Sequence, residues 1–236
     1  MSSERILAID WGYQHQSMSL LSDDTITMLE KDQLNFDPQT LVMYAREYNV
    51  NRLVVTGPQG MFLPDHIKEI PVQKVARLQA IQQGLNFLAA AESSLILLAE
   101  VGLHLFYHGE ETLYLGSLPY SFASLGLKHS LPVTNEMGCA LPKPFQDCET
   151  YALPGTENTS DTETWMAYTI ALGSKEFFAR YQIKHCYLAG NLTEDQQSLL
   201  QGFIDKATVE PLPYAMHIAS TGLLVPYLAP HAETDS

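Results

Sequence analysis

Arg5-Ile-Leu-Ala-Ile-Asp-Trp-Gly12 is the most informative stretch of the chain, because an apolar run ends there in one carboxylate and then a glycine. The run predicts a buried strand over residues 5–10 that delivers Asp10 to a tight turn. Gly12 has no Cβ atom, so a ligand or a metal ion can approach the backbone there. The stretch therefore predicts a ligand site at the end of a buried strand.

The same unit, an apolar strand that ends near a glycine, recurs along the chain. The later copies end in Thr56-Gly57, Glu100-Val-Gly102 and Ala189-Gly190. Ligands of open α/β sheets collect at such strand ends. Two apolar strands each end in a carboxylate, Asp10 and Glu100, which suggests an internal duplication with a ligand cleft between two halves.

Helix signals alternate with these strands and give an α/β pattern. A hairpin is predicted over residues 18–29, with Ser22-Asp-Asp24 as its turn. The helices are expected to start at Asp37-Pro38, at about Gln73, at about Thr162 and at the capping box Thr193-Glu-Asp-Gln196. The helix from Gln73 is expected to run to Ala91, with Val75, Leu78, Ile81, Leu85 and Leu88 on its buried face. A proline-rich insert is expected at about 128–161, within the second of the two halves.

Composition and charge limit the classes of partner. The 236 residues carry 13 basic and 27 acidic side chains, for a net charge of −14. A charge of this sign argues against nucleic acid and against an anionic membrane as main partners. The three cysteines, Cys139, Cys148 and Cys186, have no metal-type spacing and are expected to be reduced thiols in a cytoplasmic protein.

The order of these segments resembles the superfamily of actin-like ATPases, sugar kinases and Hsp70, and within it the bacterial type II pantothenate kinases. The likeness covers most of the chain as a hydrophobic pattern. It rests on the first strand with Asp10 and on the segments Leu53-Val-Val-Thr-Gly57, Gln82-Gln-Gly-Leu85, Leu97-Leu-Ala-Glu-Val-Gly102, Tyr187-Leu-Ala-Gly190 and Ile218-Ala-Ser-Thr-Gly-Leu-Leu224.

The resemblance implies two actin-like (ribonuclease H-like) halves, residues 1–92 and 93–236, around a central cleft. It implies a kinase of coenzyme A biosynthesis that uses ATP and Mg²⁺ and phosphorylates a pantothenate-like hydroxyl. Asp10 and Glu100 would be the catalytic residues, with Asp10 as the magnesium ligand. The cofactor-binding residues would be Gly12, Gly57 and Gly102 at the phosphate turns and Gly190 and Asn191 near adenosine.

The chain departs from this family at the residues that bind phosphate and catalyse its transfer. Tyr13-Gln14-His15 stands where the family has the Gly and Thr of its first phosphate turn. Leu103-His-Leu-Phe106 and Leu115–Ser121 replace two further glycine-rich loops. Arg77 falls on the family's catalytic glutamate, which reverses the charge. Backbone amides in glycine turns hold nucleotide phosphates, so these changes count against ordinary kinase activity.

Two functions therefore stay open at the level of the sequence. One is an ATP-dependent small-molecule kinase. The other is a degenerate pseudokinase that acts as a binding or regulatory subunit, with a homodimer as the expected assembly. A hydantoinase/oxoprolinase-like protein is a third reading, because the segment Thr112–Leu125 and the acidic Asn135-Glu136 resemble that group.

Each candidate residue also has a purely structural interpretation. Asp10 either binds magnesium or caps a turn, and Glu100 either acts in the site or makes an ion pair at a strand end. Arg77 either binds an anionic ligand or is paired on a helix edge. His104 and His108 lie on one face of a predicted strand, and a metal site there would need a third ligand.

Overall fold

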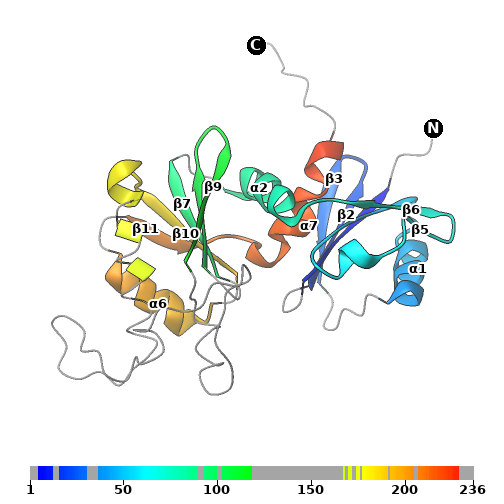
Figure 1. Ribbon diagram of the computed structural model, residues 1–236, viewed down its shortest axis with the longest axis horizontal. Coiled ribbons are helices and arrows are strands. Elements are labelled where there is room, and N and C mark those ends of the chain that lie inside the picture. Colours follow the sequence, from blue (N-terminus) through cyan, green and yellow to red (C-terminus); the bar gives the residue numbers. More distant parts are fainter. Residues whose placement is uncertain are drawn as a thin grey trace, which may run out of the picture. The chain divides into compact units, whose positions relative to one another are not determined.

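The structure is a computed structural model that describes residues 5–12, 16–30, 37–89, 93–99, 103–118, 167, 170–171, 174–175, 177–190, 192–204 and 207–228. The chain divides into two compact units (Figure 1). The first unit comprises Met1–Leu88 with Met216–Ser236, and the second comprises Ala89–Ala215. The division differs from the expected halves because the C-terminal segment groups with the first unit. The predicted insert at 128–161 lies outside the described residues.

The first unit is built on a six-stranded mixed sheet with the strand order β3-β2-β1-β4-β6-β5. β1 pairs antiparallel with β2 and parallel with β4. The strands are β1 (Ile6–Trp11), β2 (Gln16–Ser22), β3 (Thr25–Leu29), β4 (Arg52–Thr56), β5 (His66–Ile67) and β6 (Ile70–Lys74). The helices are α1 (Pro38–Glu47), the 3₁₀ turn η1 (Gly60–Phe62), α2 (Arg77–Leu88), η3 (Ala215–His217), α7 (Ile218–Gly222) and η4 (Val225–Tyr227).

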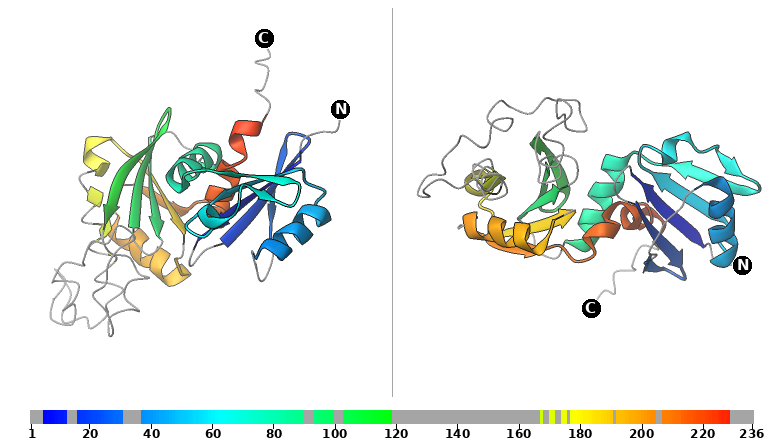
Figure 2. Two further views of the ribbon diagram at one scale, coloured as in Figure 1. Left: turned by 45° about the vertical axis from the view of Figure 1, so that its right-hand side comes forward. Right: turned by 90° about the horizontal axis from the view of Figure 1, so that it is seen from below.

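Opposite faces of this sheet carry different helices (Figure 2). Leu7 and Ile9 of β1 face α1 and form one apolar core with its buried side chains. The alternate residues of β1, among them Ala8 and Asp10, face the side where α7 packs on β1 and β2. Asp37 caps α1 as predicted, because its Oδ1 accepts from the backbone N–H of Gln39 at 2.8 Å.

The second unit repeats the strand order in a five-stranded sheet, β11-β10-β7-β8-β9. β7 pairs antiparallel with β8 and parallel with β10, as β1 does with β2 and β4. The elements are β7 (Ser94–Ala99), β8 (Leu103–His108), β9 (Thr112–Leu118), β10 (His185–Gly190), α6 (Glu194–Phe203) and β11 (Thr208–Pro211). The α/β class and the repeated strand arrangement are therefore confirmed.

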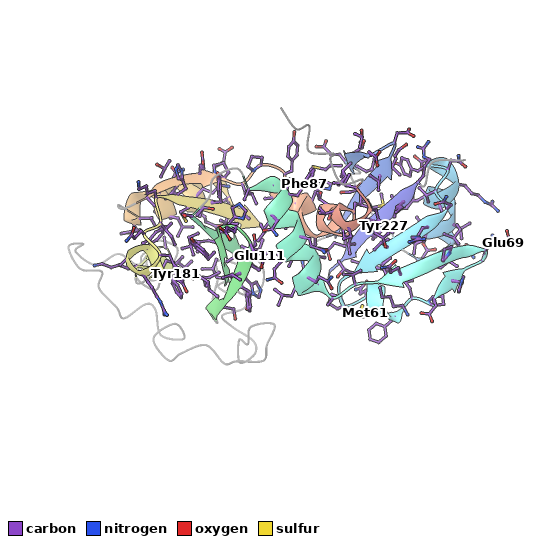
Figure 3. All side chains as sticks on the ribbon, turned by 90° about the horizontal axis from the view of Figure 1, so that it is seen from above. Met61, Glu69, Phe87, Glu111, Tyr181 and Tyr227 are labelled. Atoms are coloured by element: carbon purple, nitrogen blue, oxygen red, sulfur yellow. The ribbon has the colours of Figure 1, made fainter. Side chains whose placement is uncertain are left out.

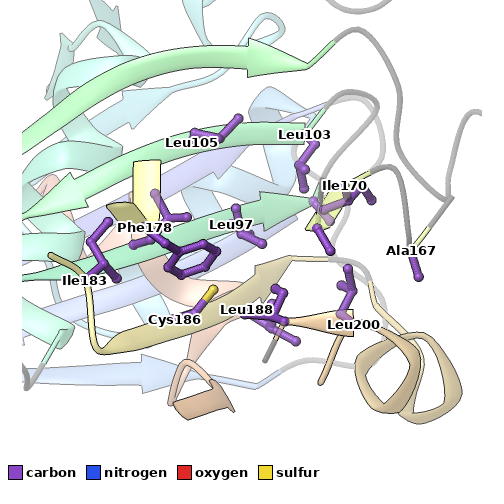
Figure 4. Close-up of a cluster of buried hydrophobic side chains, with 14 residues drawn as sticks. Leu97, Leu103, Leu105, Ala167, Ile170, Phe178, Ile183, Cys186, Leu188 and Leu200 are labelled. Carbon is purple, nitrogen blue, oxygen red and sulfur yellow. The ribbon is translucent and has the colours of Figure 1, made fainter. Parts of the chain in front are cut away.

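One face of the second sheet holds an apolar core (Figure 4). Leu97 and Leu188 of the sheet pack there against Leu200 of α6 and against Ile170 and Phe178, which lie in helical segments. Ile170 and Phe178 are both buried and lie after the helix start predicted at about Thr162. The capping box at Thr193 is confirmed as well, because the Thr193 and Gln196 side chains both bond to backbone N–H groups.

The helix predicted to begin at Gln73 is wrong in its first turn. Gln73 and Lys74 belong to β6 and lie opposite Val54 and Val55 of β4, so pairing along the sheet overrides the helical spacing. The helix itself begins at Arg77. Leu78, which was expected on the buried face, is 43% exposed, whereas Ala80 and Gly84 are buried.

Candidate functional site

Asp10 lies at the C-terminal end of β1 and is almost completely buried, with 1% of its side chain exposed. Its neighbours across the sheet are Ser17 of β2 and Thr56 of β4. Both neighbours are buried as well. A carboxylate in such a place needs a counter-charge or hydrogen-bond donors, because desolvation penalises an isolated charge.

Arg77 supplies that counter-charge. Its Nε donates to Asp10 Oδ1 and its Nη2 to Asp10 Oδ2, each over 3.2 Å. The arginine side chain is 20% exposed. These two charge-assisted hydrogen bonds engage both carboxylate oxygens and fix the Arg77 guanidinium group against Asp10. Arg77 was expected either to bind an anionic ligand or to be paired, and the structure shows it paired. Its partner is Asp10, the residue expected to hold magnesium.

The start of α2 is fixed by the neighbouring strand, which places Arg77. Thr56 Oγ1 donates to the backbone carbonyl of Val75 over 2.8 Å. The Val75 N–H donates in turn to the Val55 carbonyl over 2.9 Å. Both bonds hold Val75, two residues before Arg77, against the end of β4, so Arg77 reaches Asp10 from a fixed backbone.

The turn after β4 closes over the end of β1. Gly57 has φ +85°, and a Cβ atom there would lie 2.4 Å from the Trp11 carbonyl oxygen and 3.0 Å from Asp10 Oδ1. The Gln59 N–H donates to the same carbonyl over 3.3 Å. Packing against β1 and a left-handed backbone therefore require glycine at residue 57. Its predicted role toward a cofactor stays a prediction, as does that of Gly12.

The second unit repeats this turn without the acid. Gly190 has φ +87°, and a Cβ atom there would collide with the Ala99 carbonyl, as one at Gly57 would with the Trp11 carbonyl. Because Ala99 lies opposite Gly190 and Leu98 opposite Ala189, Leu98 is the counterpart of Asp10. The expected equivalence of Asp10 and Glu100 is therefore wrong by two residues.

Several predicted site residues cannot be placed. Glu100, Gly102 and Asn191 lie outside the described residues, and their roles stay predictions. Sequence reasoning noted the charge reversal at Arg77 but missed its pairing with Asp10. The signal was present, because Arg77 brings a positive charge to the position at which the resembled family has a glutamate, and Asp10 is a negative charge that it can pair with.

The other candidate ligands that the structure describes do not build a metal centre. Among the described residues, no group of three or more His, Cys, Asp and Glu side chains could hold a metal ion. His104 Nδ1 lies 3.4 Å from the Tyr114 hydroxyl, and His108 Nδ1 lies 3.0 Å from Thr112 Oγ1. Cys186 is a free thiol inside the second core, and burial raises its pKa, so it stays protonated.

The described residues around Asp10 do not fit Mg²⁺ either. Magnesium takes oxygen ligands in octahedral geometry and favours carboxylates and phosphates. Both oxygens of the Asp10 carboxylate accept from the Arg77 guanidinium group, and a second cation at the same oxygens would be repelled. The structure therefore disagrees with Asp10 as a magnesium ligand while the ion pair is made.

Comparisons with solved structures support the fold. Component A of (R)-2-hydroxyglutaryl-CoA dehydratase from Acidaminococcus fermentans is similar, with a TM-score of 0.54 and 10% identity over 95% of this chain and 97% of that chain. A ROK family protein from Streptococcus pneumoniae TIGR4, solved in complex with sucrose, has a TM-score of 0.50 and 11% identity over 95% and 98%. The chain thus shares its α/β fold with these two proteins, in agreement with the predicted α/β class.

The likeness is one of fold alone, because identity is so low. No protein-family model and no curated protein matches the sequence. In the described part of the chain, no helix is long and apolar enough to cross a membrane.

Proposed function

We propose that this chain is a catalytically silent protein with the actin-like fold, which acts as a binding or regulatory subunit and does not transfer phosphate through magnesium at Asp10. The observation that carries the proposal is the two-bond ion pair between Asp10 and Arg77. A guanidinium group stands where a kinase of this fold would need a cation that also binds phosphate.

The loss of catalysis follows from what the two cations can do. A magnesium ion binds carboxylate and nucleotide phosphate at once and stabilises charge that develops in the transition state. Arg77 also neutralises Asp10, but its Nε and Nη2 atoms both point at the carboxylate. The changes in the turns after Gly12 and Gly102 support the same conclusion from the sequence. A small-molecule ligand and a homodimer belong to the proposal as its partners.

A second candidate is the ATP-dependent kinase acting on a pantothenate-like hydroxyl. It is supported by the positions of Asp10, Gly57 and Gly190, which lie at or next to the C-terminal ends of the parallel strands β1, β4 and β10, where ligands of open α/β sheets collect. In this case Arg77 must leave Asp10 before magnesium binds. The two candidates therefore differ in whether the ion pair opens when ATP and magnesium are present.

Thermal melting of the full chain separates the candidates. We expect millimolar ATP with Mg²⁺ to leave Tm no higher than ATP alone does, and no ADP to form. Arg77→Gln frees the carboxylate, so magnesium should then raise Tm with ATP, and Asp10→Asn in the same chain should abolish that rise. Lys74→Gln is the matched control, because it breaks the exposed Lys74–Asp65 pair three residues before Arg77.

The kinase would give the opposite pattern. A site with an ATP excess of a hundredfold over Kd would be stabilised by about 2.7 kcal/mol. If the unaltered chain shows such a magnesium-dependent shift and forms ADP, and Asp10→Asn removes both, the proposed function is wrong.

A further inference from the structure

The C-terminal segment, residues 216–228, is fastened to the same face of the first sheet that carries Asp10. Buried hydroxyl groups make the contact. Ser17 Oγ donates to Ser220 Oγ over 3.0 Å, and Ser19 Oγ lies 2.9 Å from the same atom. Thr221 Oγ1 lies 3.5 Å from Ser19 Oγ. All four side chains are buried, so this hydroxyl cluster forms only when α7 is docked.

Two further contacts hold the ends of the segment. His217 Nδ1 donates to the Met18 carbonyl over 3.2 Å. Tyr227, which Figure 3 labels, holds the other end. Its hydroxyl donates to Gln73 Oε1 of β6, and the Arg52 guanidinium lies over its ring at 5.5 Å from the centroid. The segment is therefore fixed to strands β2, β4 and β6 of one sheet.

α7 also crosses α2 with backbone in contact with backbone. A Cβ atom at Gly84 of α2 would collide with the Ile218 carbonyl, and one at Gly222 of α7 would collide with the Ala80 carbonyl. Figure 1 shows the two helices side by side. Contact this close leaves no side chain to take up a displacement, so a shift of α2 must be passed on to α7.

These contacts close a ring within the first unit. Arg77, the first residue of α2, binds Asp10 of β1. Asp10 lies opposite Ser17 of β2 in the sheet, and Ser17 binds Ser220 of α7. The ring then returns to α2 through the glycine crossing. The ion pair and the hydroxyl cluster are thus joined twice, once through the sheet and once through the helices.

We infer that the Asp10–Arg77 ion pair and the docking of the C-terminal segment are energetically coupled, so that opening the pair loosens residues 216–228. The pair holds the start of α2, and α2 with β2 forms the seat of α7. By linkage, loosening the segment must weaken the ion pair by the same factor. A ligand that competes for Asp10 or Arg77 would thereby also loosen residues 216–228. This inference goes beyond the proposed function and does not depend on ATP binding.

Hydrogen exchange on the full chain tests the coupling, under conditions in which the chain is native. In Arg77→Gln we expect protection of the amides in 216–228 to fall at least tenfold. Amides of α1, on the opposite face of the same sheet, should change less than twofold, which separates local loosening from global unfolding. Lys74→Gln should change neither region. Equal losses in α1 and in 216–228, or no loss in 216–228, would overturn the inference.

Two further variants complete the test, one milder at Arg77 and one in the C-terminal segment. Arg77→Lys keeps the charge but loses the two-bond geometry, so its effect on 216–228 should be smaller than that of Arg77→Gln and in the same direction. Ser220→Ala removes the centre of the hydroxyl cluster. If the effects of Ser220→Ala and Arg77→Gln on the unfolding constant multiply within a factor of two, the two sites are independent and the inference fails.

Discussion

The two sheets share strand order and strand direction, yet equivalent positions on one face of each sheet carry different side chains. In the first unit the positions hold Asp10, Ser17, Ser19 and Thr56. Register gives their counterparts in the second unit as Leu98, His104, Phe106 and Ala189. The comparison teaches that this backbone does not need polar side chains there. At these positions only the first unit buries an acid and three hydroxyl groups, and their hydrogen bonds must offset the cost of desolvation.

The strongest test of this comparison puts the acid into the second unit. Leu98→Asp would bury a carboxylate at a position that is 3% exposed. We expect a loss of about 4 kcal/mol or more in the free energy of unfolding, measured by urea denaturation. Leu98→Met, of similar volume, should cost less than about 1.5 kcal/mol. A tolerated Leu98→Asp would show that the second face is as polar in practice as the first.

Gly57 and Gly190 sharpen the comparison, because at these two turns the units have the same backbone conformation. Gly57→Ala and Gly190→Ala should each lower the free energy of unfolding by about 2–4 kcal/mol, since both force a Cβ atom against a carbonyl at positive φ. Gly202→Ala in α6 meets no atom within 4 Å, and it should stabilise by about 0.5–1 kcal/mol. Urea denaturation of the three variants measures this. If alanine is neutral at either turn, the backbone there is not the one described.

The smallest expected effect is a difference in pH dependence between the helix caps Asp37 of α1 and Thr193 of α6. The pKa of Asp37 is lowered by hydrogen bonds from Thr40, first from its side chain and then from its backbone. A lowered carboxyl pKa gives stability that is present above its unfolded pKa of about 4 and is lost as pH falls through the folded value. The hydroxyl cap Thr193 of α6 does not titrate. Thr193→Ala should cost about 1 kcal/mol at every pH, whereas Asp37→Asn should matter less as pH falls from 6 to 3.

The part of the site that sequence could predict is the part set by local structure. Asp10 and Gly57 each follow an apolar run and so identify a strand end. Burial and turn geometry at such a place depend on residues that are neighbours in the sequence. The pairing of Asp10 with Arg77 joins residues that are 67 positions apart. Strands β6, β9 and β11 were not predicted, since their short or mixed patterns become strands only by pairing with neighbours.

The hydroxyl cluster shows the same limit over a longer distance. Ser17 and Ser19 alternate with Met18 and Leu20, a pattern that predicts a polar outer face for β2. Both serines are instead buried, because α7 returns from about two hundred residues later and covers them. A period of two tells which side chains share a face, but it does not tell which segment covers that face.

The order of strands and helices, the caps and the glycine turns follow from the sequence, since each depends on neighbouring residues and on the burial of apolar side chains. Tertiary structure alone decided that Arg77 neutralises Asp10, that Leu98 is the counterpart of that acid, and that the C-terminal helix closes the first unit. These outcomes depend on register and on contacts between distant segments. Their free energies arise only when the chain has brought the groups together and excluded water from them.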